Sequence, residues 1–72
     1  MKMHERVKRY VDERGLSQRL IAENMGIPES TLSRILNGNR RMTVDDYEGI
    51  CKAMAVDPAR FYKAGEVADR AT

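Results

Sequence analysis

Apolar residues recur every three or four positions along the chain, which is the spacing of amphipathic α-helices. Met3, Val7, Tyr10 and Val11 follow this spacing and predict a first helix over residues 3–14. The positions between them are mostly charged, so one face of this helix should meet solvent. The pattern favours an all-α fold.

Residues 18–38 predict two short helices that meet at a sharp turn. Ser17 is a good N-cap for the first of them. Gly26 is its expected end, because a left-handed backbone costs little for a residue without a Cβ. Pro28 suits the start of the second helix. The positions expected to face inward are Ile21, Ala22, Met25, Ile27, Leu32, Ile35 and Leu36.

The second of these helices, over about residues 28–37, has a polar outer side. On a helical wheel, Ser30, Ser33, Arg34 and Asn37 fall opposite the apolar positions. These side chains are short except for one long cation. A helix with such a face fits a groove about 12 Å wide, which is the width of the DNA major groove.

Two further helices are expected in the C-terminal part of the chain. Thr43 is a suitable N-cap, and the acids that follow it favour a helix N-terminus. Asp57 and Pro58 repeat this start for a short fifth helix over about residues 58–63. The apolar stripe predicted for the fourth helix consists of Val44, Tyr47, Ile50, Cys51 and Met54.

The length of 72 residues limits the chain to one domain with a small core. Residues 1–64 are expected to form it as a compact bundle of five short helices, and residues 65–72 to form a flexible tail. The single cysteine excludes an internal disulfide, which suits a reducing cytoplasm. No apolar run is long enough to span a bilayer, and the N-terminal residues do not resemble a secretion signal. A soluble cytoplasmic protein is therefore expected.

Charge is distributed unevenly along the chain. The net charge is only +2, which by itself is a weak argument for a polyanionic partner. Residues 1–42, however, contain nine Lys and Arg against five Asp and Glu, whereas residues 43–72 contain four against six. The basic part includes the two helices that meet at the turn, as expected if that part contacts phosphates.

The stretch around the turn combines apolar, alanine and glycine positions at fixed offsets. The residues concerned are Leu16, Ser17, Gln18, Ala22, Met25, Gly26, Ile27, Ser30, Leu32, Ser33, Ile35, Leu36, Asn37 and Gly38. Together they resemble the helix-turn-helix of lambda-repressor-like, Cro-type DNA-binding domains, and the resemblance extends to about residue 62. It implies that helices two and three form the motif. It also implies a sequence-specific regulator of transcription, of the repressor kind, that binds double-stranded DNA as a homodimer on a two-fold symmetric operator.

The resemblance also implies which residues read the bases. Glu29, Ser30 and Arg34 are the implied reading positions, with Ser33 behind them. Arg34 can form two hydrogen bonds to guanine. Glu29 departs from the uncharged residue common in the family. Its carboxylate could accept a hydrogen bond from a cytosine amino group, or pair with Arg34 or Arg41.

Contacts to DNA phosphates are expected at both ends of the motif. Ser17 and Gln18 lie at a helix N-terminus, which favours anions and faces a phosphate in the resembled family. Arg19 could contact the DNA backbone too, or pair with Glu23 four residues later. The connector that leaves the third helix should pass beside a phosphate strand. The contacts expected there are Asn37, Arg40 and Arg41.

Two points stay open at this stage. The dimer surface is expected around the fourth and fifth helices, and its candidates are Met54, Val56, Phe61 and Tyr62, of which Val56 and Phe61 fit the core better. The alternative function is a protein-interaction module, such as an antitoxin-like or adaptor protein with the same fold. Glu29 and the small net charge favour this alternative, whereas the arginines favour DNA.

The sequence does not contain the residues that catalysis would require. His4 is the only histidine, and there is neither a P-loop nor a glycine-rich dinucleotide turn. Too few ligands are present for a metal site. Cys51 lies on an apolar stripe and is expected to pack rather than react. The sequence thus predicts a protein that is not an enzyme and that has no cofactor, metal or small-molecule substrate.

Overall fold

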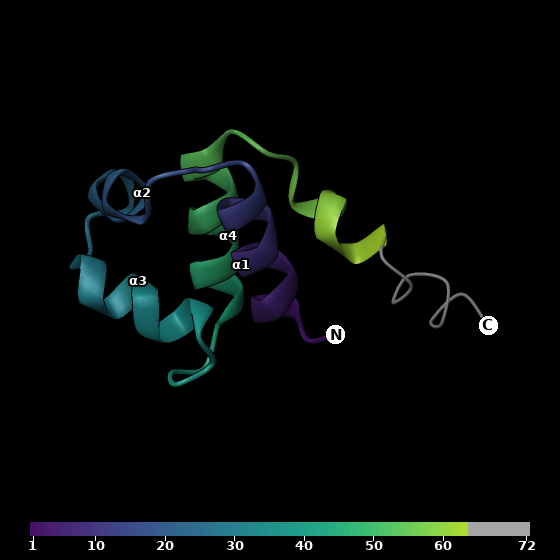
Figure 1. The fold of residues 1–72 in the computed structure, drawn as a ribbon, viewed down its shortest axis with the longest axis horizontal. Helices are drawn as coiled ribbons and strands as arrows, with labels where there is room; N and C mark the ends of the chain where they lie inside the picture. The colour runs from purple at the N-terminus through teal and green to yellow at the C-terminus, as the bar shows by residue number, and fades with distance from the viewer. Residues whose placement is uncertain (64–72) are drawn as a thin grey trace.

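The computed structural model describes residues 1–63 of the chain, in which four α-helices precede a 3-10 helix (Figure 1). The all-α prediction is confirmed. The predicted tail, residues 65–72, lies outside the described residues. In chain order the elements are α1 (Met3–Glu13), α2 (Gln18–Met25), α3 (Glu29–Leu36), α4 (Val44–Met54) and η1 (Pro58–Lys63).

The fifth element is a 3-10 helix, where the sequence predicted a fifth helix without specifying its type. Its start is held by Asp57, whose carboxylate accepts the backbone N–H of Ala59 at 2.9 Å. The carbonyl of Asp57 also accepts the N–H of Arg60, three residues later, at 2.9 Å. Such i to i+3 bonds define a 3-10 helix.

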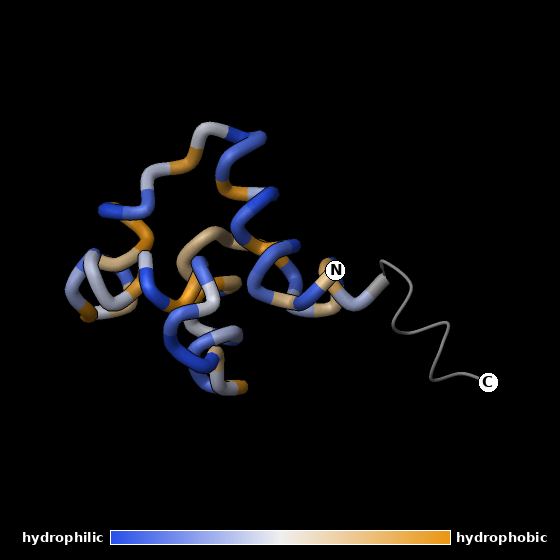
Figure 2. Tube along the Cα trace, turned by 60° about the horizontal axis from the view of Figure 1, so that its bottom comes forward, coloured by the Kyte–Doolittle hydropathy of each residue, from blue (hydrophilic) through white to orange (hydrophobic). Residues whose placement is uncertain are grey.

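The helices surround one small core. α2 packs against α3 and α4, α3 packs against α1, and η1 packs against α1 and α4 (Figure 1). Along each helix, apolar positions alternate with polar ones, so each element can bury one side (Figure 2). The buried apolar residues are Val7, Val11, Ile21, Ala22, Leu32, Ile35, Leu36, Tyr47, Ile50, Cys51 and Phe61, and Met25 and Ile27 are half-buried against them.

The prediction that Val44 belongs to the apolar stripe of α4 is wrong. Its side chain is 70% exposed, whereas Tyr47, one turn later, is buried. Val44 is the first residue of α4 and lies at the protein surface. The neighbouring helices cover the later turns of α4 but not its first residue.

Side-chain caps start α2 and α4, and a glycine ends α2, at the positions that the sequence predicted. The hydroxyl of Ser17 accepts the N–H of Leu20 at 3.1 Å, and Gly26 ends α2 with φ +75°. At the start of α4, Thr43 and Asp46 cap each other: each backbone N–H donates to the other's side-chain oxygen, at 3.0 and 3.1 Å. These caps fix the lengths of helices too short to be stable alone.

The aromatic residues of the chain form one cluster that holds η1 against the rest of the domain. The rings of Tyr10 and Phe61 meet edge to face with centroids 5.4 Å apart, and Tyr47 contacts both Phe61 and Tyr62. The hydroxyl of Tyr47 donates to the carbonyl of Pro58.

Burial is the main cause that raises the pKa of both the Tyr47 hydroxyl and the Cys51 thiol. The thiol therefore stays protonated at neutral pH.

An unpredicted contact joins the N-terminus of the chain to the end of α3. Gly38 follows α3 with φ +79°, and a Cβ placed there would lie 2.5 Å from Nε2 of His4. The imidazole therefore packs directly on the backbone of Gly38. His4 has a packing role that its position near the chain end did not indicate.

α2 and α4 both end in a residue with left-handed backbone. This residue is Gly26 after α2 and Ala55, with φ +59°, after α4, so the two positions can be compared. A left-handed residue with a Cβ costs roughly 1–2 kcal/mol. We expect Gly26→Ala to destabilise the domain by about this amount, since no atom lies within 4 Å of the added Cβ. Ala55→Gly is the reverse change at an equivalent position and should stabilise it by the same amount, roughly 1–2 kcal/mol. Urea denaturation of both variants measures the two changes, and effects of the same sign would contradict the assignment.

The contact between His4 and Gly38 predicts an interaction in a double-mutant cycle. Gly38→Ala should destabilise the domain more than Gly26→Ala, because its Cβ must displace the imidazole as well as occupy a left-handed conformation. With His4→Ala in place, the cost of Gly38→Ala should fall to the roughly 1–2 kcal/mol of the backbone alone. Equal costs in both backgrounds, measured by urea denaturation, would show that the ring does not rest on Gly38.

Candidate nucleic-acid interface

α2 and α3 form a rigid corner. Their axes cross steeply: α2 is seen end-on in Figure 1 while α3 lies across the view. Gly26 bends the chain at the corner, and the N–H of Ile27 donates back to the carbonyl of Ala22 at 3.1 Å. Ala22 is buried, where its small side chain lets the two helices approach closely.

The outer side of α3 is the surface that this corner presents. Leu32, Ile35 and Leu36 are buried, so the opposite side of the helix faces solvent. The four exposed polar residues on that side are Glu29, Ser30, Arg34 and Asn37, and Ser33 is half-buried. The structure thus brings the predicted base-reading residues together on one short helix; they are Glu29, Ser30, Ser33 and Arg34. Their roles in binding stay predictions.

Of the two roles left open for Glu29, the ion pair with Arg34 or Arg41 is not formed among the described residues. Glu29 lies in the first turn of α3, where a carboxylate is favoured by the helix dipole. Its exposed carboxylate is therefore available to accept hydrogen bonds from a partner.

The N-terminus of α2 brings Ser17, Gln18 and Arg19 together. The Ser17 hydroxyl is occupied by the N–H of Leu20, which leaves the first backbone N–H groups of the helix directed outward. Arg19 pairs with Glu23, with Nε and Oε2 3.3 Å apart, and both side chains are more than half exposed. The pair expected from the sequence is thus present, and at this exposure it costs little to open.

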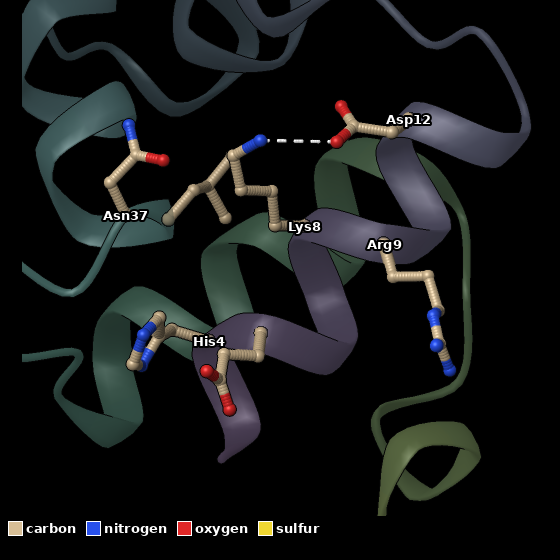
Figure 3. A pocket seen from close by; sticks show the side chains of 7 residues that line it. His4, Lys8, Arg9, Asp12 and Asn37 are labelled. Carbon is tan, nitrogen blue, oxygen red and sulfur yellow. Dashed lines mark hydrogen bonds and ion pairs between the residues drawn. The ribbon is translucent and has the colours of Figure 1, made fainter. Parts of the chain in front are cut away.

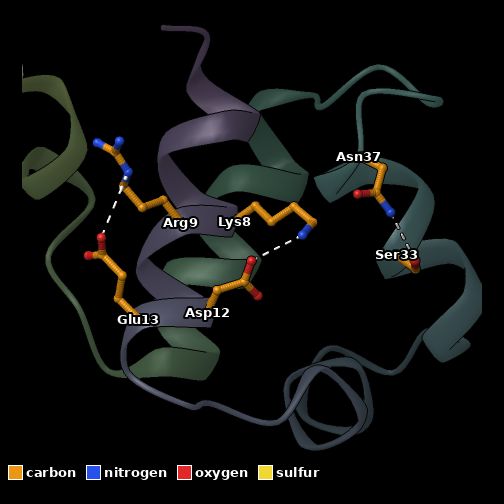
Figure 4. A network of polar contacts seen from close by, with 6 residues as sticks. All are labelled: Lys8, Arg9, Asp12, Glu13, Ser33 and Asn37. Carbon is orange, nitrogen blue, oxygen red and sulfur yellow. Dashed lines mark hydrogen bonds and ion pairs between the residues drawn. The ribbon is translucent and has the colours of Figure 1, made fainter.

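The C-terminal end of α3 continues into a loop that folds back on the helix. The N–H groups of Asn39 and Arg40 both donate to the carbonyl of Arg34, at 2.9 and 3.2 Å. Asn37 donates from Nδ2 to the hydroxyl of Ser33 at 3.2 Å (Figure 4). The loop and its cations are therefore attached to the last turn of the helix that carries Arg34.

Arg34, Arg40 and Arg41 are all exposed, and none forms an ion pair within the part of the chain that the structure describes. The cations on α1 and α2 are different. Lys8, Arg9 and Arg19 each lie beside an acid four residues later. The end of α3 is thus a place where positive charge is not neutralised locally, which favours an anionic partner.

The sequence did not predict that α1 borders this surface. His4 packs on Gly38, and Lys8 lies beside Asn37 on the side of α1 that faces α3 (Figure 3). These contacts join residues about thirty positions apart. The sequence pattern of α1 predicted that one face of the helix is charged, but it did not indicate which other helix that face lies against.

Residues 1–63 contain neither a metal-binding cluster nor a membrane-spanning helix. There, no three His, Cys, Asp or Glu side chains are grouped so that they could hold a metal ion. No helix in the same part of the chain has the length and apolar character to cross a membrane.

Comparison with known families agrees with this geometry. The sequence model of a helix-turn-helix domain family matches residues 5–61, which include all of α2, α3 and α4 and most of α1. That family falls within the broad lambda-repressor-like group. No curated protein and no solved structure gave a significant match. Because the match covers most of the chain, the protein belongs to this helix-turn-helix domain family.

Proposed function

We propose that the protein is a sequence-specific regulator of transcription, of the Cro-type repressor kind, that inserts α3 into the major groove of double-stranded DNA in the cytoplasm. The observation that carries this proposal is the exposed Arg34 on a side of α3 that otherwise bears short polar residues. Short side chains let the helix approach the base edges closely, and the long arginine supplies two donors that match guanine.

The affinity of the proposed complex comes from backbone contacts. Gln18 at the start of α2 and Asn37 at the end of α3 lie at opposite ends of the motif, so they can contact phosphates on either side of one groove. Arg40 and Arg41 add two cations that need not leave an acidic partner first. Each phosphate that is neutralised releases counterions, which makes the affinity depend on salt.

The choice of sequence comes from base contacts. Arg34 can donate two hydrogen bonds to guanine, and such a contact discriminates between bases by about 1–3 kcal/mol. Glu29 can accept from the amino group of cytosine. Ser30 can donate to or accept from a neighbouring base, and Ser33 orients Asn37 through their hydrogen bond.

This division of labour predicts different outcomes for two arginine variants. Arg34→Ala should lower the affinity for the preferred duplex by about ten- to a hundredfold and change the affinity for other duplexes much less. Arg41→Ala should weaken binding to all duplexes alike and reduce the salt dependence of log K by about 0.9. Fluorescence anisotropy on duplexes selected in vitro from a random library measures both effects. Lys52→Ala removes the same charge from the exposed side of α4 and serves as the control.

The outcomes separate this proposal from the alternative function. If both arginine variants weakened binding equally on every duplex, Arg34 would be a phosphate contact and not a base reader. If the wild-type protein bound no duplex at low ionic strength, DNA binding would be excluded. The interaction of this fold with another protein would then be the function to test.

A single eight-residue helix touches only a few base pairs, so we also propose a homodimer on a two-fold symmetric operator. Phe61 is buried, which removes one predicted interface residue and confirms its assignment to the core. Val44, 70% exposed, lies near Tyr62, which is 37% exposed. Both line a shallow apolar hollow of about 170 Å³ with Met3 and Met42. This patch adjoins the loop after α3, because Met42 and Thr43, which border the hollow, lie between that loop and α4.

Val44→Glu tests the dimer surface without disturbing the fold. An acid at the first position of a helix is favourable, so the separated subunits should keep the wild-type helix content, measured by circular dichroism. A charge between two subunits should dissociate the dimer and lower the affinity for a two-fold symmetric duplex about tenfold or more. Sedimentation equilibrium measures the dissociation of the dimer, and fluorescence anisotropy measures the affinity for the duplex. Val44→Ile is the apolar control. A Val44→Glu protein that sediments as the wild-type dimer would place the interface elsewhere.

A further inference from the structure

A hollow of about 360 Å³ lies between α1 and the C-terminal end of α3 (Figure 3). His4, Lys8 and Asp12 border it from α1, and Asn37 borders it from the end of α3. The hollow is open to solvent, and His4, which borders it, packs on Gly38 at the start of the loop that carries Arg40 and Arg41. It is a polar recess beside the proposed DNA surface.

α1 carries two ion pairs of the same kind that point in different directions (Figure 4). Lys8 pairs with Asp12 at 3.1 Å on the side that faces α3. Arg9 also borders the hollow, but it pairs with Glu13 at 3.8 Å, and its guanidinium points away from Asn37. All four side chains are at least a third exposed, so each pair contributes only a few tenths of a kcal/mol to stability. The two pairs therefore differ mainly in their surroundings.

The surroundings of Lys8 favour an anionic partner. Its ammonium is a compact charge on a flexible stem, and it lies near Asn37, a proposed phosphate contact. Two carboxylates also border the hollow. Glu5 is already occupied, because it accepts the backbone N–H of Lys2 at 2.7 Å, and this hydrogen bond is the main cause that lowers the pKa of Glu5. Asp12 is the carboxylate that holds Lys8.

We propose that Lys8 binds a DNA backbone phosphate in this hollow, and that Asp12 holds the lysine until the phosphate replaces it. The proposal rests on the DNA-binding function proposed above. It extends the interface from the motif to α1, a helix for which the sequence predicted no role in binding. One strand of the duplex would then be contacted by Lys8, Asn37 and Arg40 or Arg41 together.

Four single variants, two from each ion pair, test this proposal. In Lys8→Ala the slope of log K against log salt concentration should fall by about 0.9, so that the loss of affinity between 50 and 200 mM salt is about threefold smaller than in the wild type. Asp12→Asn removes the competing carboxylate and should tighten binding by about twofold at low salt. Arg9→Ala and Glu13→Gln make the same charge changes in the pair whose guanidinium points away from Asn37, and they should leave the slope unchanged.

Two additional variants protect the interpretation. Lys8→Arg should retain the wild-type slope, because a guanidinium also binds phosphate. Lys8→Gln keeps a long polar side chain and should behave as Lys8→Ala does. Thermal melting of each variant shows whether it is folded under the binding conditions.

The possible failures are distinguishable. If Lys8→Ala and Arg9→Ala changed the slope equally while the wild type bound DNA, the role of Lys8 would be overturned and the proposed function would stand. A stronger effect of Glu13→Gln than of Asp12→Asn would overturn the role of Asp12. If the wild-type protein bound no duplex at 50 mM salt, both the proposed function and this inference would fail.

Discussion

The burial of one side of α3 is the constraint on which the rest of the structure depends. A helix of eight residues is not stable alone in water, so α3 exists because Leu32 and Ile35, both fully buried, pack into the core. The same burial determines what the helix shows to solvent. With its apolar side fixed against α1 and α2, Arg34 has no orientation available except outward. The same packing interaction thus stabilises α3 and directs its polar side to solvent.

The charges of the domain follow a second rule, which net charge conceals. Within residues 1–63, Lys8 and Arg9 on α1 and Arg19 on α2 lie beside acids of their own helix, whereas Arg34, Arg40 and Arg41 do not. An ion pair must open before its cation can meet a phosphate, but exposed Arg34, Arg40 and Arg41 carry no such cost. A net charge of only +2 therefore still leaves one surface suited to a polyanion.

What could be predicted from the sequence was local. The caps at Ser17 and Thr43 and the left-handed Gly26 each depend on a few neighbouring residues, so the pattern identified them correctly. The helical wheel likewise gave the outer side of α3. Contacts between distant segments left no such signal, and the packing of His4 on Gly38 went unpredicted. The assignment of Val44 to the core failed because periodicity gives a direction around the helix but not whether a neighbour covers that end.

The connection between α3 and its following loop decides how affinity and sequence choice are related. The carbonyl of Arg34 accepts two N–H groups of the loop, and Gly38 is held by His4 of α1. The cations proposed to bind phosphates and the side chain proposed to read bases therefore belong to one rigid unit. Phosphate contacts fix the position of a protein on the duplex. In this domain they would also fix how far Arg34 reaches into the groove, so that the loop contributes to sequence choice without touching a base.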